Sequence, residues 1–215
     1  MNENRMTSWK EEEIACPKCG QLHKVRKYQV INASQKPAIK EDILKNRIFF
    51  FECANCKLAA PLTYPCIYVD SKKKLAFLLS PELGEETNEL LRDIGDLSGY
   101  KKRFVDNIND LKEKIMIYEN HLDDRVIELV KVEYVRQLEK EMKDDEMNNI
   151  LFDYSGNDMY MMVFFERKGI GRIPLNLDFY RQIEHRYERE LPVRQADVFD
   201  RIDMEWAGNI VLGRS

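Results

Sequence analysis

Four of the five cysteines in the sequence form two Cys-x-x-Cys pairs. The first pair is Cys16 and Cys19, and the second pair is Cys53 and Cys56. Two residues between thiolates allow a tight turn to direct both sulfur atoms at one ion, and two such pairs supply the four ligands of a tetrahedral zinc site. The sequence therefore predicts that these four cysteines bind zinc.

The predicted centre leaves no position for chemistry at the metal. Zinc with four thiolate ligands lacks an open site for water or substrate, so we expect the zinc to be structural and the protein to be non-enzymatic. The spacing alone leaves open an iron ion on the same ligands. A thioredoxin-like redox pair is less favoured, because it would open a helix in a βαβ unit and neither pair precedes an amphipathic helix.

Two other residues near the pairs have ordinary explanations. His23 lies close to the first pair and could replace a ligand, but four cysteines already complete the site, so we expect a plain strand or surface histidine. Cys66 lies in the apolar segment 65–69 and is expected to be a small buried hydrophobic residue.

Each pair is expected to lie at the tip of two hairpin-like strands. Pro17 fixes φ inside the first turn, and Gly20 allows a positive φ just after it. The aromatic segment 48–52 leads directly into the second pair as a strand. The 33 residues between the pairs exceed the usual separation of about 15–20, and a short inserted helix over 37–47 explains the excess.

The other strands of this region are expected over 25–31, 59–69 and 74–79, with a polar turn at 70–73. Together with 48–52 they predict a small antiparallel sheet that carries the metal at one end. We expect residues 10–80 to form this zinc-ribbon-like domain and residues 81–98 to form a linker.

Residues 99–145 are predicted to form a helical hairpin. Apolar residues recur at spacings of four and three from Phe104 to Leu122, which is the pattern of one helical face, and a second helix follows over 122–142. The apolar face over 100–142 could bind a protein partner or a second copy of the chain, or it could pack within the chain. We expect an interaction or scaffold role, with self-association through these helices.

Residues 146–215 are predicted to form a small α/β extension. A β-hairpin is expected over 149–154 and 159–166, a further strand over 172–175 and a helix over 178–189. In the tail, Val198, Ile202 and Trp206 would share one helical face. The fold class expected for the whole chain is therefore α+β.

Charge is distributed unevenly along the chain. Residues 1–80 carry a net charge of +6 and residues 81–215 a net charge of −10. The basic part suggests a nucleic-acid-binding regulator as an alternative function. The whole chain is acidic, however, with a net charge of −4, so this alternative is not favoured. The phosphate contacts would come from Lys24, Arg26, Lys27, Lys36 and Lys40.

Three carboxylates at the start of the second predicted helix, Asp123, Asp124 and Glu128, provide a second alternative. They could perform acid–base or metal chemistry in an enzyme. The simpler interpretation is that the two aspartates cap the helix and interact with its dipole. We favour capping, because no nucleophile, histidine cluster or glycine-rich loop accompanies them.

The sequence also excludes some classes of protein. No apolar run approaches the roughly 20 residues of a membrane-spanning helix. Residues 1–13 are polar and acidic and contain no apolar stretch of a secretory signal. We therefore expect no membrane association and a cytoplasmic location, where paired cysteines bind metal more often than they form disulfides.

Several of these segments together resemble the CpXC domain family of bacterial and archaeal proteins, which is named for its Cys-Pro-x-Cys motif. The similar segments are 16–19, 31–33 with Pro37, 53–56, 68–70 and 111–131. The resemblance implies a zinc-ribbon-like module with an attached helical segment, and it implies no activity. The second pair departs from the family pattern, because Ala54 and Lys57 stand where proline and glycine are expected, and its turn should be less rigid.

Overall fold

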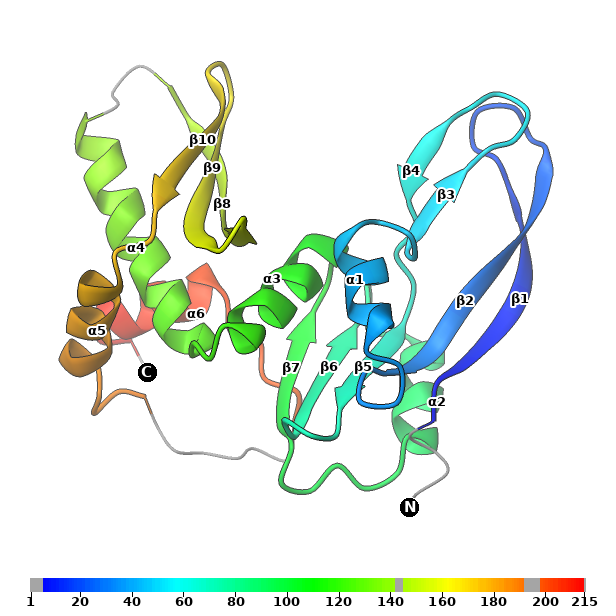
Figure 1. Ribbon diagram of the computed structural model, residues 1–215, viewed down its shortest axis with the longest axis horizontal. Coiled ribbons are helices and arrows are strands. Elements are labelled where there is room, and N and C mark those ends of the chain that lie inside the picture. The colour runs from blue at the N-terminus through cyan, green and yellow to red at the C-terminus, as the bar shows by residue number, and fades with distance from the viewer. Residues whose placement is uncertain (1–5, 142–144, 192–197, 215) are drawn as a thin grey trace. The chain divides into compact units, whose positions relative to one another are not determined.

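The computed structural model describes residues 6–141, 145–191 and 198–214 (Figure 1). These residues form two compact units. The first contains 6–112 and 198–200, and the second contains 113–141, 145–191 and 201–214. Helices accompany three separate sheets, which confirms the predicted α+β class.

The first unit is built on a five-stranded sheet in the order β1-β2-β5-β6-β7. Strands β2 and β5 are parallel, as are β6 and β7, and the other neighbours are antiparallel. Helix α1 and the hairpin β3–β4 lie in the chain between β2 and β5. The bounds are β1 Ser8–Ala15, β2 Leu22–Asn32, α1 Ala38–Leu44, β3 Phe50–Glu52, β4 Ala59–Pro61, β5 Cys66–Asp70, β6 Leu75–Leu79, α2 Glu85–Asp93 and β7 Lys101–Val105.

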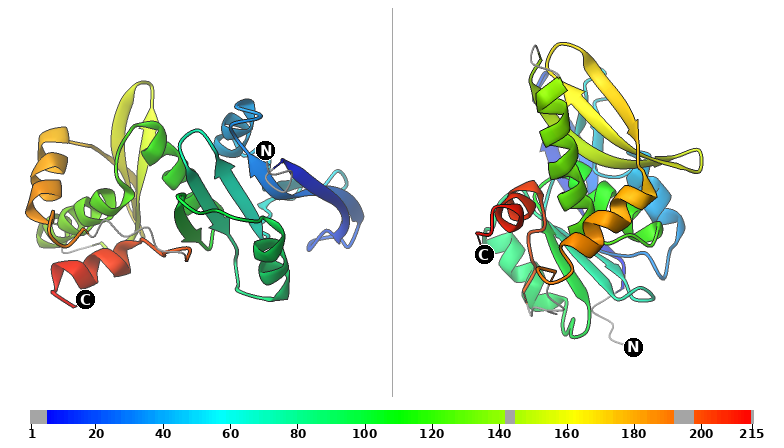
Figure 2. Two further views of the ribbon diagram at one scale, coloured as in Figure 1. Left: turned by 90° about the horizontal axis from the view of Figure 1, so that it is seen from below. Right: turned by 90° about the vertical axis from the view of Figure 1, so that its left-hand side faces the viewer.

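The prediction of one antiparallel sheet is wrong, although the inserted helix is confirmed as α1. The long connection between β2 and β5 is a crossover that carries α1, and a crossover of this kind returns the chain in the parallel direction. Hairpin β3–β4 forms a separate two-stranded sheet. Figure 2 shows α1 and α2 on opposite faces of the five-stranded sheet.

The predicted strand over 59–69 is divided into β4 and β5. Pro61 ends β4 and Pro65 precedes β5, and proline lacks the N–H group that a continuous ladder requires. The interruption allows the chain to leave the small sheet of the hairpin and enter the five-stranded sheet.

The span 81–98, which we expected to be a linker, contains helix α2. Leu90, Ile94 and Leu97 are buried and pack against Ile67 of β5 and Leu78 of β6. The helix is short, and its apolar residues lie at its C-terminal end and beyond it. Sequence periodicity over so few turns is a weak signal.

The first predicted helix begins later than expected. Phe104 belongs to β7, and helix α3 spans Ile108–Glu119. The side chain of Asn107 accepts a hydrogen bond from the N–H of Asp110 at 3.0 Å and so caps the start of the helix. Strand β7 pairs with β6, a partner that is distant in sequence, so the local spacing of apolar residues could not separate strand from helix here.

The second unit combines helices with a three-stranded sheet in the order β10-β9-β8. Helix α4 packs against α5, α6 and β8. The tail prediction is wrong at Val198, which is 63% exposed and lies before α6. The bounds are α4 Asp124–Glu141, β8 Met147–Ser155, β9 Asp158–Phe165, β10 Gly169–Pro174, α5 Leu177–Arg186 and α6 Met204–Val211.

Much of the apolar face predicted for residues 100–142 is buried within the chain, and residue 142 lies outside the described residues. Leu111 and Ile115 of α3 are at most 2% exposed, and Val126 and Val130 of α4 are at most 1% exposed. Val126 and Val130 belong to the core of the second unit together with Phe152 of β8. Packing inside the chain therefore accounts for the helical pattern that we considered for self-association.

Among the described residues, none of the helices has the length and apolar character needed to span a membrane.

Candidate metal centre

The two Cys-x-x-Cys pairs lie at the tips of the two hairpins, as predicted. The β1–β2 ladder ends at the pair Ala15–Leu22, so residues 16–21 form the first tip. The β3–β4 ladder ends at Glu52–Ala59, so residues 53–58 form the second tip. The tips meet at the upper right of Figure 1.

Both tips have the same backbone hydrogen bonds. In the first tip, Cys16 accepts from the N–H of Gly20 at 2.9 Å and donates its own N–H to the carbonyl of Gln21 at 2.9 Å. In the second tip, Cys53 accepts from Lys57 at 3.0 Å and donates to Leu58 at 2.8 Å. Both Cys-x-x-Cys pairs therefore adopt the same type of turn.

The four sulfur atoms converge on one point. The Sγ atoms of Cys16 and Cys56 are 3.6 Å apart, as are those of Cys19 and Cys53. All four lie within 4.8 Å of one another and could hold a metal ion. A disulfide bond would bring two sulfurs to about 2.05 Å, and all four cysteines are free.

The surroundings of the thiols shift their pKa values in opposite directions. The N–H of Gln21 and the side chain of Asn55 lower the pKa of the Cys19 thiol to about 6. The N–H of Leu58 also lowers the pKa of the Cys56 thiol, but burial and the neighbouring sulfurs outweigh it and raise that pKa to about 11. A bound cation would favour the thiolate form of all four cysteines, because it balances their negative charge.

Two residues beside the sulfur atoms support the site. The Nδ2 group of Asn55 donates to the Sγ atom of Cys19 at 3.6 Å. Our sequence reasoning overlooked Asn55, although its place inside the second pair was a usable signal. His23 lies on β2, as expected, but it is not a plain strand histidine, because its Nε2 atom is 3.3 Å from the Sγ atom of Cys53. Its ring also meets Phe51 edge to face, with 5.2 Å between ring centroids.

Cys66 has no part in this centre. It lies on β5 and is 1% exposed, and burial raises the pKa of its thiol. The prediction of a small buried hydrophobic residue is confirmed.

Replacement of Lys57 with glycine is expected to stabilise the second tip. Gly20 has a φ of +73° and Lys57 has a φ of +57°, a left-handed conformation that disfavours residues with a Cβ atom. We expect the variant to gain about 1 kcal/mol in free energy of unfolding, measured by urea denaturation of the metal-loaded protein.

The matched control is Lys57→Ala, which removes the lysine side chain but keeps the Cβ atom. It should give little or no gain. Equal stabilisation by alanine and glycine would contradict the explanation, because the gain would then come from losing the lysine and not from relief of backbone strain.

The five basic residues considered for nucleic-acid binding do not form one free surface. The ammonium group of Lys27 lies 2.6 Å from a carboxylate oxygen of Glu12. That of Lys40 lies 2.8 Å from Asp70. Lys36 is exposed before α1. Two of the five are therefore committed to ion pairs.

The remaining two basic residues face an acidic strand. The antiparallel register places Lys24 opposite Glu13 and Arg26 opposite Glu11. Cross-strand pairs of opposite charge stabilise a hairpin. The register thus places opposite charges across the hairpin, but within the described residues neither Lys24 nor Arg26 forms an ion pair with these glutamates.

The carboxylates considered for catalysis are engaged in ion pairs in the second unit. Asp123 precedes α4, and its carboxylate lies 2.6 Å from the guanidinium of Arg125. Asp124 and Glu128 are buried, with oxygen atoms 3.4 Å and 3.0 Å from the ammonium group of Lys114. Asp123 accepts the N–H of Arg125 at 2.9 Å, which supports the capping interpretation for Asp123. The carboxylate of Asp124 instead accepts from the hydroxyl of Tyr118 at 2.5 Å.

The buried carboxylates belong to a larger cluster that the sequence did not reveal. Lys131 lies 2.7 Å from Glu113 and 3.0 Å from Glu128. With Asp124 and Lys114 the cluster has three acids and two bases, and all five are at most 3% exposed. If every group were ionised, the cluster would bury a net negative charge. Burial therefore raises the pKa of Glu113 to about 7, although the ammonium group of Lys131 opposes the rise.

The stability of the second unit is expected to fall as the pH rises from about 4.5 to about 7. The pKa of Glu113 is raised from 4.5 to about 7 on folding, so the folded state holds a proton that the unfolded chain releases. The free energy of unfolding should decrease by up to about 1.4 kcal/mol per pH unit in this window. Hydrogen exchange of the α4 amides measures it locally.

The variant Glu113→Gln carries a neutral side chain at every pH and should lose this dependence. An unchanged pH profile in the variant would contradict the assignment to Glu113.

Comparison with known protein families gives a match for this chain. The profile of a protein family described as "CpXC protein" matches residues 14–131, which is more than half of the chain and includes all four cysteines of the centre. Comparisons with curated proteins and with solved structures gave no match.

Proposed function

The chain belongs to the CpXC protein family, and from this premise we propose that it is a non-enzymatic interaction module in which the four cysteines bind a structural zinc ion. One observation carries the proposal. Four Sγ atoms from two Cys-x-x-Cys pairs, which 33 residues separate in the chain, lie within 4.8 Å of one another. A zinc ion there would join the two tips and fix the hairpins to each other.

The donor set fits zinc. A tetrahedron with Zn–S bonds of about 2.3 Å has edges of about 3.8 Å, and two of the sulfur–sulfur distances are 3.6 Å. Thiolates are soft ligands that zinc accepts in tetrahedral structural sites. Cys53 is fully buried and Cys16 is 2% exposed, so half of the centre is shielded from water and exchange.

A binding role is supported over a catalytic one. Four thiolates occupy every position of a tetrahedral zinc ion, so none is left for a water molecule. The acids considered for catalysis are held by lysine and arginine side chains, and Asp124 is fully buried. A carboxylate in that position can stabilise the fold, but it cannot reach a substrate without local unfolding.

Cobalt substitution tests whether the site is closed. Cobalt bound by four thiolates should give the visible absorption of a tetrahedral tetrathiolate complex. Cyanide or azide should leave that spectrum unchanged, because no ligand position is free. A spectrum that changes on addition of these anions would show an exchangeable position and would favour a catalytic metal.

A further inference from the structure

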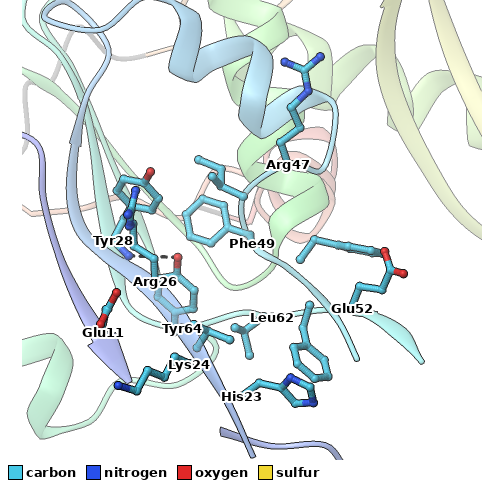
Figure 3. A pocket seen from close by; sticks show the side chains of 14 residues that line it. Glu11, His23, Lys24, Arg26, Tyr28, Arg47, Phe49, Glu52, Leu62 and Tyr64 are labelled. Atoms are coloured by element: carbon cyan, nitrogen blue, oxygen red, sulfur yellow. Dashed lines mark hydrogen bonds between the residues drawn. The ribbon is translucent and has the colours of Figure 1, made fainter. Parts of the chain in front are cut away.

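A groove of about 520 Å³ lies in the first unit between strands β2 and β3 (Figure 3). Its floor is aromatic. The rings of Phe49 and Tyr64 are 5.0 Å apart between centroids, and both residues are at most 4% exposed. Charged side chains from three segments also line it, namely Glu11, Lys24, Arg26, Arg47 and Glu52.

One wall of the groove is an open strand edge. Strand β1 occupies one edge of β2, and within the described chain β5 covers the other edge only from Val30 onward. The N–H of Tyr28 points away from β1, because it donates to the hydroxyl of Tyr64 at 3.1 Å. Backbone groups alternate in direction along a strand. The N–H and C=O groups of Lys24 and Arg26 therefore also point away from β1.

The opposite wall has an open edge as well. Phe49 and Cys53 form backbone hydrogen bonds to the segment that contains β4, at 2.9 Å and 2.8 Å. By the same alternation, the backbone groups of Phe50 and Glu52 point away from β4. Both residues line the groove, and Phe50 is 42% exposed. Two accessible strand edges thus border one groove.

We propose that this groove binds an extended acidic segment of a partner protein, which adds to β2 as a strand. Exposed strand edges bind extended peptides through main-chain hydrogen bonds, while alternate side chains enter pockets. Here apolar side chains of the segment would contact the exposed Phe50 and the half-buried Val25 and Leu62, which line the groove above its aromatic floor. The proposal rests on the proposed function, because the metal centre holds the two hairpins together.

Charge complementarity selects an acidic segment. Within the described chain, neither Lys24 nor Arg26 has a carboxylate within ion-pair distance, and both are exposed. The guanidinium of Arg26 lies 4.1 Å over the ring of Trp9 of β1, and Arg26 lines the groove together with Lys24. Acidic side chains of an added strand would neutralise both residues.

The same groove is less suited to a nucleic acid. Glu11 and Glu52 line it together with the basic residues, and their carboxylates would repel a continuous chain of phosphates. A peptide can avoid this repulsion, because it places its acidic side chains only at chosen positions. The open N–H and C=O groups also match the backbone of a peptide.

Nuclear magnetic resonance of the zinc-loaded full chain tests the proposal. The probe is an acetylated hexapeptide that alternates glutamate with valine, added up to about 1 mM. We expect shifts in the amide signals of Lys24, Arg26, Phe50 and Glu52. Methylation of the valine nitrogens should weaken binding by about tenfold or more, because it removes main-chain donors. A hexapeptide that alternates lysine with valine should bind more weakly than the acidic probe.

The matched variants carry the same change in net charge. Lys24→Gln with Arg26→Gln should weaken binding of the acidic probe about three- to tenfold. Lys36→Gln with Lys72→Gln, two exposed lysines outside the groove, should leave it unchanged.

Three results would overturn the proposal. The first is that the amide shifts are absent or confined to residues outside the groove. The second is that the methylated peptide binds as tightly as the unmethylated one. The third is that an oligothymidine of similar length binds more tightly than the acidic peptide. The zinc content of the same sample is measured independently. If the chain contains zinc but does not bind the peptide, only this inference is refuted. If the chain contains no zinc, the proposed function is refuted.

Discussion

Replacement of Cys53 with serine is expected to abolish zinc binding and to unfold the two hairpin tips. Cys53 is fully buried, and its Sγ atom is 3.6 Å from that of Cys19. Complete structural zinc sites contribute about 10–16 kcal/mol of apparent binding free energy in isolated finger peptides. That is comparable with the whole stability of a typical domain, about 5–15 kcal/mol. Elemental analysis measures the loss of zinc, and hydrogen exchange of residues 8–32 and 50–61 measures the unfolding of the two hairpins.

Cys66→Ala is the matched control, because it removes the one cysteine that is outside the centre. It should retain one zinc ion per chain and the protection of the hairpins. If Cys53→Ser retained zinc and normal protection while Cys66→Ala lost them, the assignment of ligands would be wrong.

The second large effect is expected at Lys114 in the second unit. Its side chain is 2% exposed, and its ammonium group lies 3.0 Å from Glu128 and 3.4 Å from Asp124. It also donates to the carbonyl of Ile202 at 2.7 Å. Lys114→Met would leave two carboxylates buried without this partner, and we expect a loss of about 3–5 kcal/mol in free energy of unfolding. Urea denaturation, with hydrogen exchange of the α4 amides as a local probe, measures this loss in free energy of unfolding.

The control for this prediction lies two positions earlier on the same helix. Lys112 is only partly buried, and among the described residues its ammonium group contacts Asn46 and no carboxylate. Lys112→Met should therefore cost less than about 1 kcal/mol. Similar losses in both variants would show that Lys114 stabilises the fold through its hydrocarbon chain and not through the buried charge cluster.

The metal centre was predictable from the sequence because its signal is local. The spacing of Cys16 and Cys19, repeated at Cys53 and Cys56, specifies each turn within six residues. Gly20 correctly predicted the left-handed residue of the first turn. The same left-handed conformation at Lys57 in the second turn could not be predicted, because lysine is not a residue type that indicates a positive φ.

The arrangement around the centre depends on contacts between distant segments and was not predictable in detail. Glu11 lies opposite Arg26, and β2 pairs in parallel with β5. The local sequence of a strand does not indicate its partner strand or its register, so neither pairing could be predicted. Lys114 illustrates the same difficulty in the second unit. In the sequence it lies among charged residues of an amphipathic helix, yet it is buried because Asp124 and Glu128 meet it from α4.

The metal content of the native protein tests the account most directly. Elemental mass spectrometry of the protein purified without added metal, together with its intact mass under native conditions, gives the metal and its stoichiometry. The account predicts one zinc ion per chain and four reduced thiols at the hairpin tips. A different metal, or a chain without metal whose paired cysteines are joined as disulfides, would contradict it.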